Sequence, residues 1–309
     1  MAAVALLDAL RAVTSFTPPA VLPDCDLGLF ADVLEAHGLA PLAAYQLEHT
    51  RLGAGVPSAV RERLLAQYQG VAQDNVMKLV TLRNLLRETA EIPVVLLEAA
   101  AYVDWLYPHM AFRPLGDLRA AVRGADGPRL VEALRGTMGA APRVEQGGRV
   151  LVLSDGRISL SVQEGLWPGG PEDAPLFERR VAYRVFGPGA ARPSPEDALL
   201  ACVADQALLG LQAPLVAYLD LRELVLLRPD AAYVRERARA LRLSRALHGA
   251  LALVAHFWPE AADAAAALDP ELAAAERLAV RRVVDAARDP ARLRRVRGVD
   301  AAARLVVAP

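Results

Sequence analysis

The amino-acid sequence predicts an α+β fold, with a small mixed β-sheet core between an N-terminal and a C-terminal helical region. Long segments near both ends repeat apolar residues at helical spacing, whereas residues 92–165 hold short apolar or alternating runs bounded by turn residues. Hydrophobic residues make up 54% of the chain and aromatic residues only 5%, which favours helices around an aliphatic core. We therefore expect three regions along the chain, at 1–91, 92–186 and 187–309.

The N-terminal region is predicted to be helical throughout. In "LGLFADVLEAHGL" the apolar residues form one stripe, and Gly38 is a plausible C-terminal cap. Residues 57–91 form the longest periodic segment, with apolar residues returning to one face and charged residues opposite them. This spacing predicts one long helix.

The period changes at residue 92. Residues 92–97 are a short apolar run typical of a buried strand, and 99–107 are predicted to be a helix. A second strand is expected at 117–122, followed by a helix over 124–139. Two alternating runs separated by Asp155-Gly156 then predict a β-hairpin.

Residues 186–197 are rich in Pro and Gly and are predicted to connect the sheet core to the C-terminal helices. Ser194 is expected to cap the next helix, because Pro195 suits its first position and two acidic residues follow in the first turn. The chain is then predicted to remain helical to about residue 305.

Composition narrows the classes of function. A net charge of −1 predicts neither nucleic-acid nor membrane partners. Lys78 is the only lysine, so Schiff-base chemistry has no other candidate. Cys25 and Cys202 have no metal-binding spacing, and no apolar run reaches the roughly 18 residues that span a bilayer. We expect a soluble, cytoplasmic protein.

Several short motifs follow one another in a recognisable order over about residues 25–230. They are Asn75 in the long helix, "VVLLEAA", "LYP", Arg113-Pro114, "GDLRAAV", "ISLSVQ", Pro195-Glu196-Asp197 and Leu219-Asp220. This order resembles the nucleotidyltransferase superfamily of the polymerase β type, and within it a large bacterial group of uncharacterised nucleotidyltransferase-like proteins. The resemblance implies a nucleotidyltransferase-like α+β core.

The resemblance also implies a catalytic site, and this chain departs from it. Active relatives carry an Asp-x-Asp pair on one strand and a third carboxylate on a neighbouring strand, which together hold two Mg²⁺ ions. Here Asp117 keeps the first position, but Arg119 occupies the second and Ser159 the third. Ser161 stands where the family often has His. We expect Asp117 to pair with Arg119 or Arg113 and no metal to bind, with Asp104 or Asp155 as the helpers if one metal does.

The nucleotide-binding positions implied by the resemblance are Glu98, Ala99 and Arg113, of which only Arg113 is unaltered. Relatives place a Gly at the turn between strand and helix, so that backbone N–H groups can approach a triphosphate. Glu98 instead puts a negative charge where a phosphate would lie.

Three hypotheses for function follow. The first is a catalytically degenerate nucleotidyltransferase, a pseudoenzyme that needs no cofactor and acts by binding an unknown protein partner or a nucleotide. The second is an active enzyme that uses Mg²⁺ and an NTP with non-standard metal ligands, and transfers a nucleoside monophosphate to a small molecule or a protein. The third is an interaction scaffold formed by the helical regions.

Overall fold

The computed structural model describes residues 2–138, 143–145, 150–154, 158–293 and 301–309, and these form two compact units. Unit 1 comprises Met1–Gln73, His109–Pro114 and Cys202–Pro309, and unit 2 comprises Asp74–Pro108 and Leu115–Ala201. The expected division into three consecutive regions stays a prediction about the order of elements along the chain.

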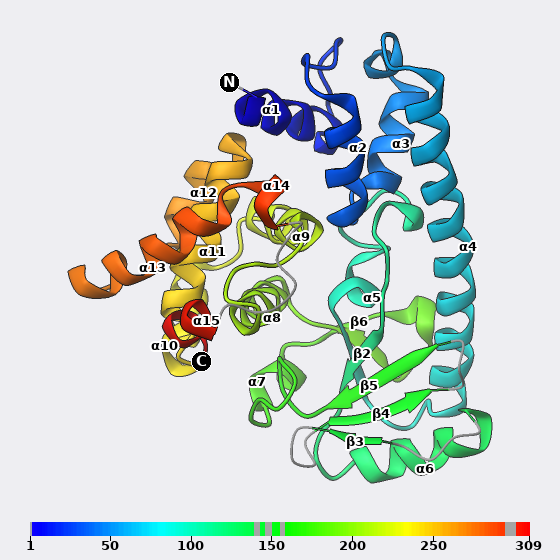
Figure 1. The fold of residues 1–309 in the computed structure, drawn as a ribbon. Coiled ribbons are helices and arrows are strands. Elements are labelled where there is room, and N and C mark those ends of the chain that lie inside the picture. Colours follow the sequence, from blue (N-terminus) through cyan, green and yellow to red (C-terminus); the bar gives the residue numbers. More distant parts are fainter. Residues whose placement is uncertain (1, 139–142, 146–149, 155–157, 294–300) are drawn as a thin grey trace. The chain divides into compact units, whose positions relative to one another are not determined.

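Unit 1 is helical in the residues described. Helix α11 is amphipathic and packs its buried Leu247, Ala250 and Val254 among neighbouring helices of this unit. In the N-terminal part of the unit, the Asp26 side chain caps the start of α2. Gly38 follows the end of α2 in the left-handed conformation, at φ +70°. Its α-helices, labelled in Figure 1, are α1 (Ala2–Thr14), α2 (Leu27–Ala36), α3 (Ala40–His49), α9 (Leu215–Leu226), α10 (Ala231–Ala240), α11 (Ser244–Phe257), α12 (Ala262–Leu268), α13 (Ala274–Ala287), α14 (Pro290–Leu293) and α15 (Ala301–Val307). Its 3-10 helices are η1 (Arg51–Gly53), η2 (Met110–Phe112) and η5 (Pro259–Ala261).

Two long helices contribute residues to both units. Helix α4 (Ser58–Glu88) confirms the predicted long helix, and its residues from Asp74 onward belong to unit 2. Helix α8 (Pro195–Leu208) begins as predicted, because the Ser194 hydroxyl accepts a hydrogen bond from the Asp197 amide at 3.2 Å. No helix among the residues described is long and apolar enough to cross a membrane.

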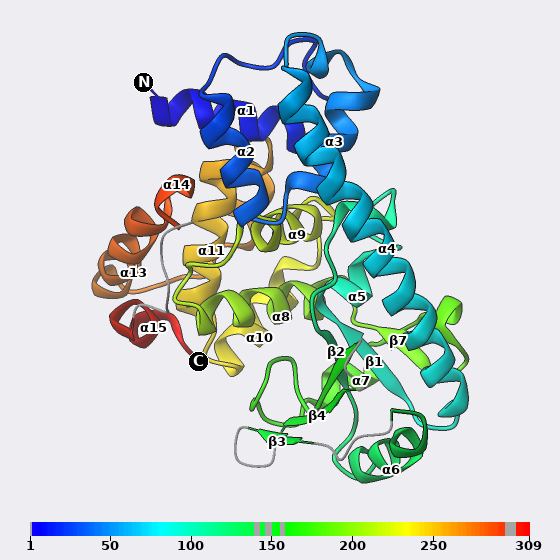
Figure 2. The same cartoon turned by 45° about the vertical axis from the view of Figure 1, so that its right-hand side comes forward.

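Unit 2 is built on a mixed sheet with the strand order β3-β4-β5-β2-β1-β7-β6. The pairs β1–β7 and β2–β5 are parallel, and the other pairs are antiparallel. This confirms an α+β fold with a mixed sheet. The elements are β1 (Val94–Leu97), α5 (Glu98–Tyr102), β2 (Leu118–Ala121), α6 (Gly127–Met138), β3 (Arg143–Glu145), β4 (Val150–Ser154), β5 (Ser159–Gln163), α7 (Ala174–Glu178), β6 (Val181–Ala182), η4 (Arg184–Phe186) and β7 (Ala190–Arg192), and Figure 2 shows β1, β2 and β7 side by side.

The sheet corrects two predictions. The helix expected over 99–107 ends at Tyr102, and the Pro/Gly-rich connection at 186–197 contains β7, which pairs with β1. The predicted hairpin is confirmed, since β4 and β5 pair antiparallel from Ser154↔Ser159 onward. Its turn residues, 155–157, lie outside the described residues.

Candidate functional site

The candidate site lies in unit 2, where the end of β1 meets the starts of β2 and β5 (Figures 1 and 2). Arg119 pairs with Leu97 across the antiparallel β1–β2 ladder and with Ser161 across the parallel β2–β5 ladder. Residues paired across a sheet point to the same face, and so do residues two apart on one strand. Arg119, Ser159, Ser161 and Gln163 therefore share one face of the sheet.

Asp117 precedes β2 by one residue, and it is exposed. The β2–β5 register begins at Leu118↔Leu160, and its continuation by one residue places Asp117 beside Ser159. Asp117 and Ser159 therefore meet at this end of the sheet, and the family resemblance predicts that active relatives carry carboxylates at both positions. One of them still carries a carboxylate, and the other carries a hydroxyl.

The loop that carries Asp117 is fastened to helix α4 by two hydrogen bonds. The buried Asn75 side chain accepts from the Leu115 amide at 3.2 Å, and the Lys78 ammonium donates to the Gly116 carbonyl at 2.8 Å. Gly116 has φ +58°, a backbone conformation that a residue with a Cβ rarely adopts. Asn75 and Lys78 are three residues apart and lie on one face of the helix, so both side chains reach the same loop. The only lysine of the chain thus helps to position the start of β2.

Arg119 forms an ion pair with Glu98, and its side chain is only 11% exposed. Its guanidinium also donates to the Gln163 side-chain oxygen at 3.3 Å. The expectation that Asp117 pairs with Arg119 or Arg113 is therefore wrong. Arg119 reaches across β1 to Glu98, because the antiparallel register places it opposite Leu97, the residue before Glu98.

Glu98 occupies the turn between β1 and α5, at φ +50°. This left-handed conformation costs a residue with a Cβ about 1–2 kcal/mol relative to a right-handed one. The following residue, Ala99, is 2% exposed and packs into the core of unit 2. The turn that the family resemblance predicts to approach a phosphate therefore carries a carboxylate that is bound to Arg119.

Arg113 belongs to unit 1, where it binds the buried Asp220. Its Nε lies 2.9 Å and 3.1 Å from the two carboxylate oxygens of Asp220, and the Asp220 side chain is 2% exposed. The Arg-Pro and Leu-Asp motifs thus supply the two partners of one buried ion pair. Arg113 was predicted as a nucleotide-binding position, and that role stays a prediction.

The side chains at the three carboxylate positions do not fit a pair of Mg²⁺ ions. Mg²⁺ requires oxygen ligands, of which a carboxylate is a strong one and a serine hydroxyl a weak one. Arg119 offers no acceptor, and its fixed charge would repel a cation held by Asp117. Among the residues described, no three His, Cys, Asp or Glu side chains form a cluster that could hold a metal ion, and Asp155 lies outside them.

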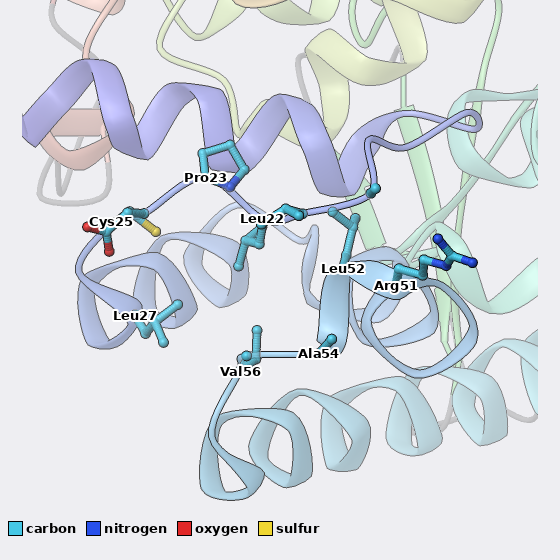
Figure 3. Close-up of a pocket in the computed structure, with 12 residues that line it drawn as sticks. Leu22, Pro23, Cys25, Leu27, Arg51, Leu52, Ala54 and Val56 are labelled. Atoms are coloured by element: carbon cyan, nitrogen blue, oxygen red, sulfur yellow. The ribbon is translucent and has the colours of Figure 1, made fainter.

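A separate cavity of about 180 Å³ lies in unit 1 between residues 20–27 and 51–56 (Figure 3). Burial raises the pKa of the Cys25 thiol, and the neighbouring Asp24 and Asp26 raise it further. The thiol is therefore held in its protonated, poorly nucleophilic form. The lining is mostly apolar and consists of Ala20, Val21, Leu22, Pro23, Asp24, Cys25, Leu27, Arg51, Leu52, Ala54, Gly55 and Val56.

The mixed sheet and the site at its end are consistent with a nucleotidyltransferase-like protein. The family model described as "Uncharacterised nucleotidyltransferase" matches residues 23–259, and the chain belongs to this family. Searches of curated proteins and of solved structures gave no match. The family resemblance carried by the short motifs is thereby confirmed.

Sequence reasoning did not assign roles to three residues that shape this site. Gln163 and Asn75 belong to two of the short motifs without a predicted role of their own, and Lys78 stands out only as the single lysine. The rarity of lysine was the available signal. Of the 35 Lys and Arg residues, 34 are Arg, and the one Lys lies where its ammonium binds a backbone carbonyl. No signal within the sequence indicated that Gln163 would bind Arg119.

Proposed function

We propose that this protein has lost nucleotidyl transfer and acts by binding a protein partner or a nucleotide that it does not turn over. The observation that carries the proposal is the ion pair between Arg119 and Glu98. These two residues stand at the family's second carboxylate position and at its phosphate-binding turn. Each has the charge opposite to the one that the chemistry requires.

Electrostatics support this proposal. Nucleotidyl transfer by two metal ions needs carboxylates to hold the metals beside the attacking and leaving oxygens. A guanidinium at the centre of that arrangement adds a positive charge where the metals would lie, and Glu98 adds a negative charge where the triphosphate would lie. Because the two charges neutralise each other, the substitutions are compatible with a stable fold, while they replace a metal-binding carboxylate and place a carboxylate at the turn where the triphosphate of a substrate would lie.

One observation favours the alternative, an active Mg²⁺-dependent enzyme. The Asp117 carboxylate is exposed, and no described residue forms an ion pair or a hydrogen bond with it. An exposed carboxylate at the start of a strand is available to one divalent ion. On this alternative, Asp117 would be essential for turnover, whereas the proposed function gives it no catalytic role.

A turnover assay separates the two. The intact protein is incubated with labelled ATP, GTP, CTP and UTP in Mg²⁺ and then in Mn²⁺, with candidate small-molecule and protein acceptors. We expect no sustained release of pyrophosphate. Sustained release that is abolished by Asp117→Asn, but not by Asp263→Asn at an exposed position of unit 1, would overturn the proposal.

A thermal-shift titration then separates nucleotide from protein partners. A nucleotide that binds only the folded state stabilises it by about 2.7 kcal/mol at 100 times its Kd. This stabilisation raises the Tm by a readily measured amount. A shift with one or more nucleotides supports the nucleotide-binding form of the proposal. If transfer and shift are both absent, the protein-partner form is the one that stands, and it is tested by capture with the intact protein followed by reconstitution from purified components.

A further inference from the structure

We propose that the Glu98 carboxylate is an internal substitute for an external oxyanion, and that Arg119, held in place by Gln163, is the receptor that it occupies. The ligand class is a phosphate group, either free or at the end of a nucleotide. This inference rests on the proposed function, since it takes the site to be one of binding. It adds a specific ligand chemistry and a device that keeps the site closed.

The receptor is preorganised by Gln163. This side chain is 1% exposed, and its amide nitrogen donates to the Gly165 carbonyl at 2.8 Å. That bond directs the amide oxygen toward Arg119, which it meets at 3.3 Å. An arginine held in this way loses little further freedom on binding an acceptor, and guanidinium groups bind carboxylates and phosphates with the same donor geometry.

The occupant is held less firmly than the receptor. The Glu98 side chain is 29% exposed, whereas the Arg119 side chain is 11% exposed, so water competes more readily for the carboxylate than for the guanidinium. Its backbone also lies in the left-handed region, at φ +50°. The turn between β1 and α5 fixes this backbone conformation, but the carboxylate beyond it is partly exposed, so an external anion with more acceptor oxygens can compete with it for Arg119.

The surroundings suit an oxyanion on one side and oppose it on the other. The half-buried Ser159 and Ser161 share the face of Arg119, and their hydroxyls can donate hydrogen bonds to an anion. The Lys78 ammonium, close to the start of β2, is already paired with the Asp74 carboxylate at 2.8 Å and bound to the Gly116 carbonyl, so it adds little attraction for an anion. Asp117 is the opposing charge, and it is exposed, so solvent screens it.

The test is isothermal titration of the intact protein without divalent metal, in EDTA, with inorganic phosphate, pyrophosphate and ATP as the three probes. We expect Glu98→Gln to bind at least one probe about tenfold more tightly than the wild type does. The matched control Glu91→Gln removes an exposed carboxylate elsewhere in unit 2 and should leave the affinity unchanged. The double variant Glu98→Gln, Arg119→Gln should lose the gained binding.

The three probes distinguish the sources of the phosphate group. Tighter binding of all three identifies a receptor for the phosphate group itself, and tighter binding of ATP alone identifies a nucleotide phosphate; both support the inference. Equal affinity of Glu98→Gln and the wild type, or undiminished binding by the double variant, would overturn it. Glu98→Gly provides a second variant that also relieves the backbone, in case Glu98→Gln is poorly folded.

This test is independent of turnover. Sustained pyrophosphate release from NTPs would overturn the proposed function whatever the phosphate affinities are. Unchanged phosphate affinity in Glu98→Gln would overturn only the receptor, and it would leave a binding protein without this ligand site.

Discussion

The left-handed conformation of Glu98 predicts an uncommon result, in which glycine is a better replacement than alanine. Glu98→Ala removes the ion pair with Arg119 and keeps a Cβ at φ +50°. Glu98→Gly removes the same ion pair and relieves the Cβ. The left-handed conformation costs about 1–2 kcal/mol with a Cβ, and glycine loses roughly 0.5–1 kcal/mol more backbone entropy on folding. We therefore expect the Gly variant to be about 1 kcal/mol more stable than the Ala variant.

The assay is urea denaturation, in which unfolding is monitored by hydrogen exchange and mass spectrometry. Peptides from β1 and β2 report on unit 2 separately. For a denaturant slope of about 3 kcal/mol per molar urea, the two midpoints should differ by roughly 0.3 M. Arg242 is a matched control, since it is exposed, follows α10 at φ +59° and forms no ion pair with any described residue. Its Gly and Ala variants should show the same preference in unit 1. An Ala variant at position 98 that equals or exceeds the Gly variant would refute the reasoning.

Three further predictions concern unit 1. Asp220→Asn should destabilise it by about 3–5 kcal/mol in urea denaturation, because Arg113 would remain buried beside a neutral amide. Alkylation of Cys25 by iodoacetamide at pH 8 should be slower than that of a peptide thiol, because its raised pKa lowers the fraction of thiolate. The pKa of His256 is lowered by burial and by the charges of Arg288 and Arg11. The unfolded chain therefore takes up a proton first, and the free energy of unfolding should decline as the pH falls through the ordinary histidine pKa of about 6.5.

Each of these has its own control. Asp8→Asn removes the partly exposed partner of Arg11 and should cost at most about 1 kcal/mol, so an equal loss in both Asn variants would contradict the first prediction. Asp24→Asn should speed the alkylation of Cys25, because it removes one of the charges that raise the thiol pKa. The pH effect should be smaller in His256→Gln; a wild-type and a variant with identical pH profiles would contradict the third.

The sequence predicted the elements whose patterns are local. The long helix α4, the strands β1 and β2 and the hairpin of β4 and β5 each repeat apolar residues with one period over several turns or pleats. Strand β7 escaped prediction because Ala190–Arg192 is only three residues long and lies among Pro and Gly. It is a strand because β1 offers it a parallel edge, and β1 is almost 100 residues earlier in the chain.

The candidate site was predictable to a similar extent. The two-residue period of "SLSVQ" puts Ser159, Ser161 and Gln163 on one face of a strand, and β5 is paired as a strand over these residues. The partner of Arg119 was not predictable. Two acidic residues, Asp117 and Glu98, were within reach by sequence, and the choice between them depends on the register of β1 against β2. A shift of that register by one residue would reverse the face of Arg119 and abolish the ion pair.

The assembly of unit 1 from both ends of the chain has a consequence for biosynthesis. Met1–Gln73 is synthesised before unit 2, but Cys202–Pro309, which completes unit 1, is synthesised after unit 2. The helices of Met1–Gln73 therefore keep apolar faces exposed to solvent while unit 2 is synthesised. Truncation from the C-terminus should consequently leave unit 1 unable to fold and dependent on chaperones, and neither unit can be cut out as one continuous piece.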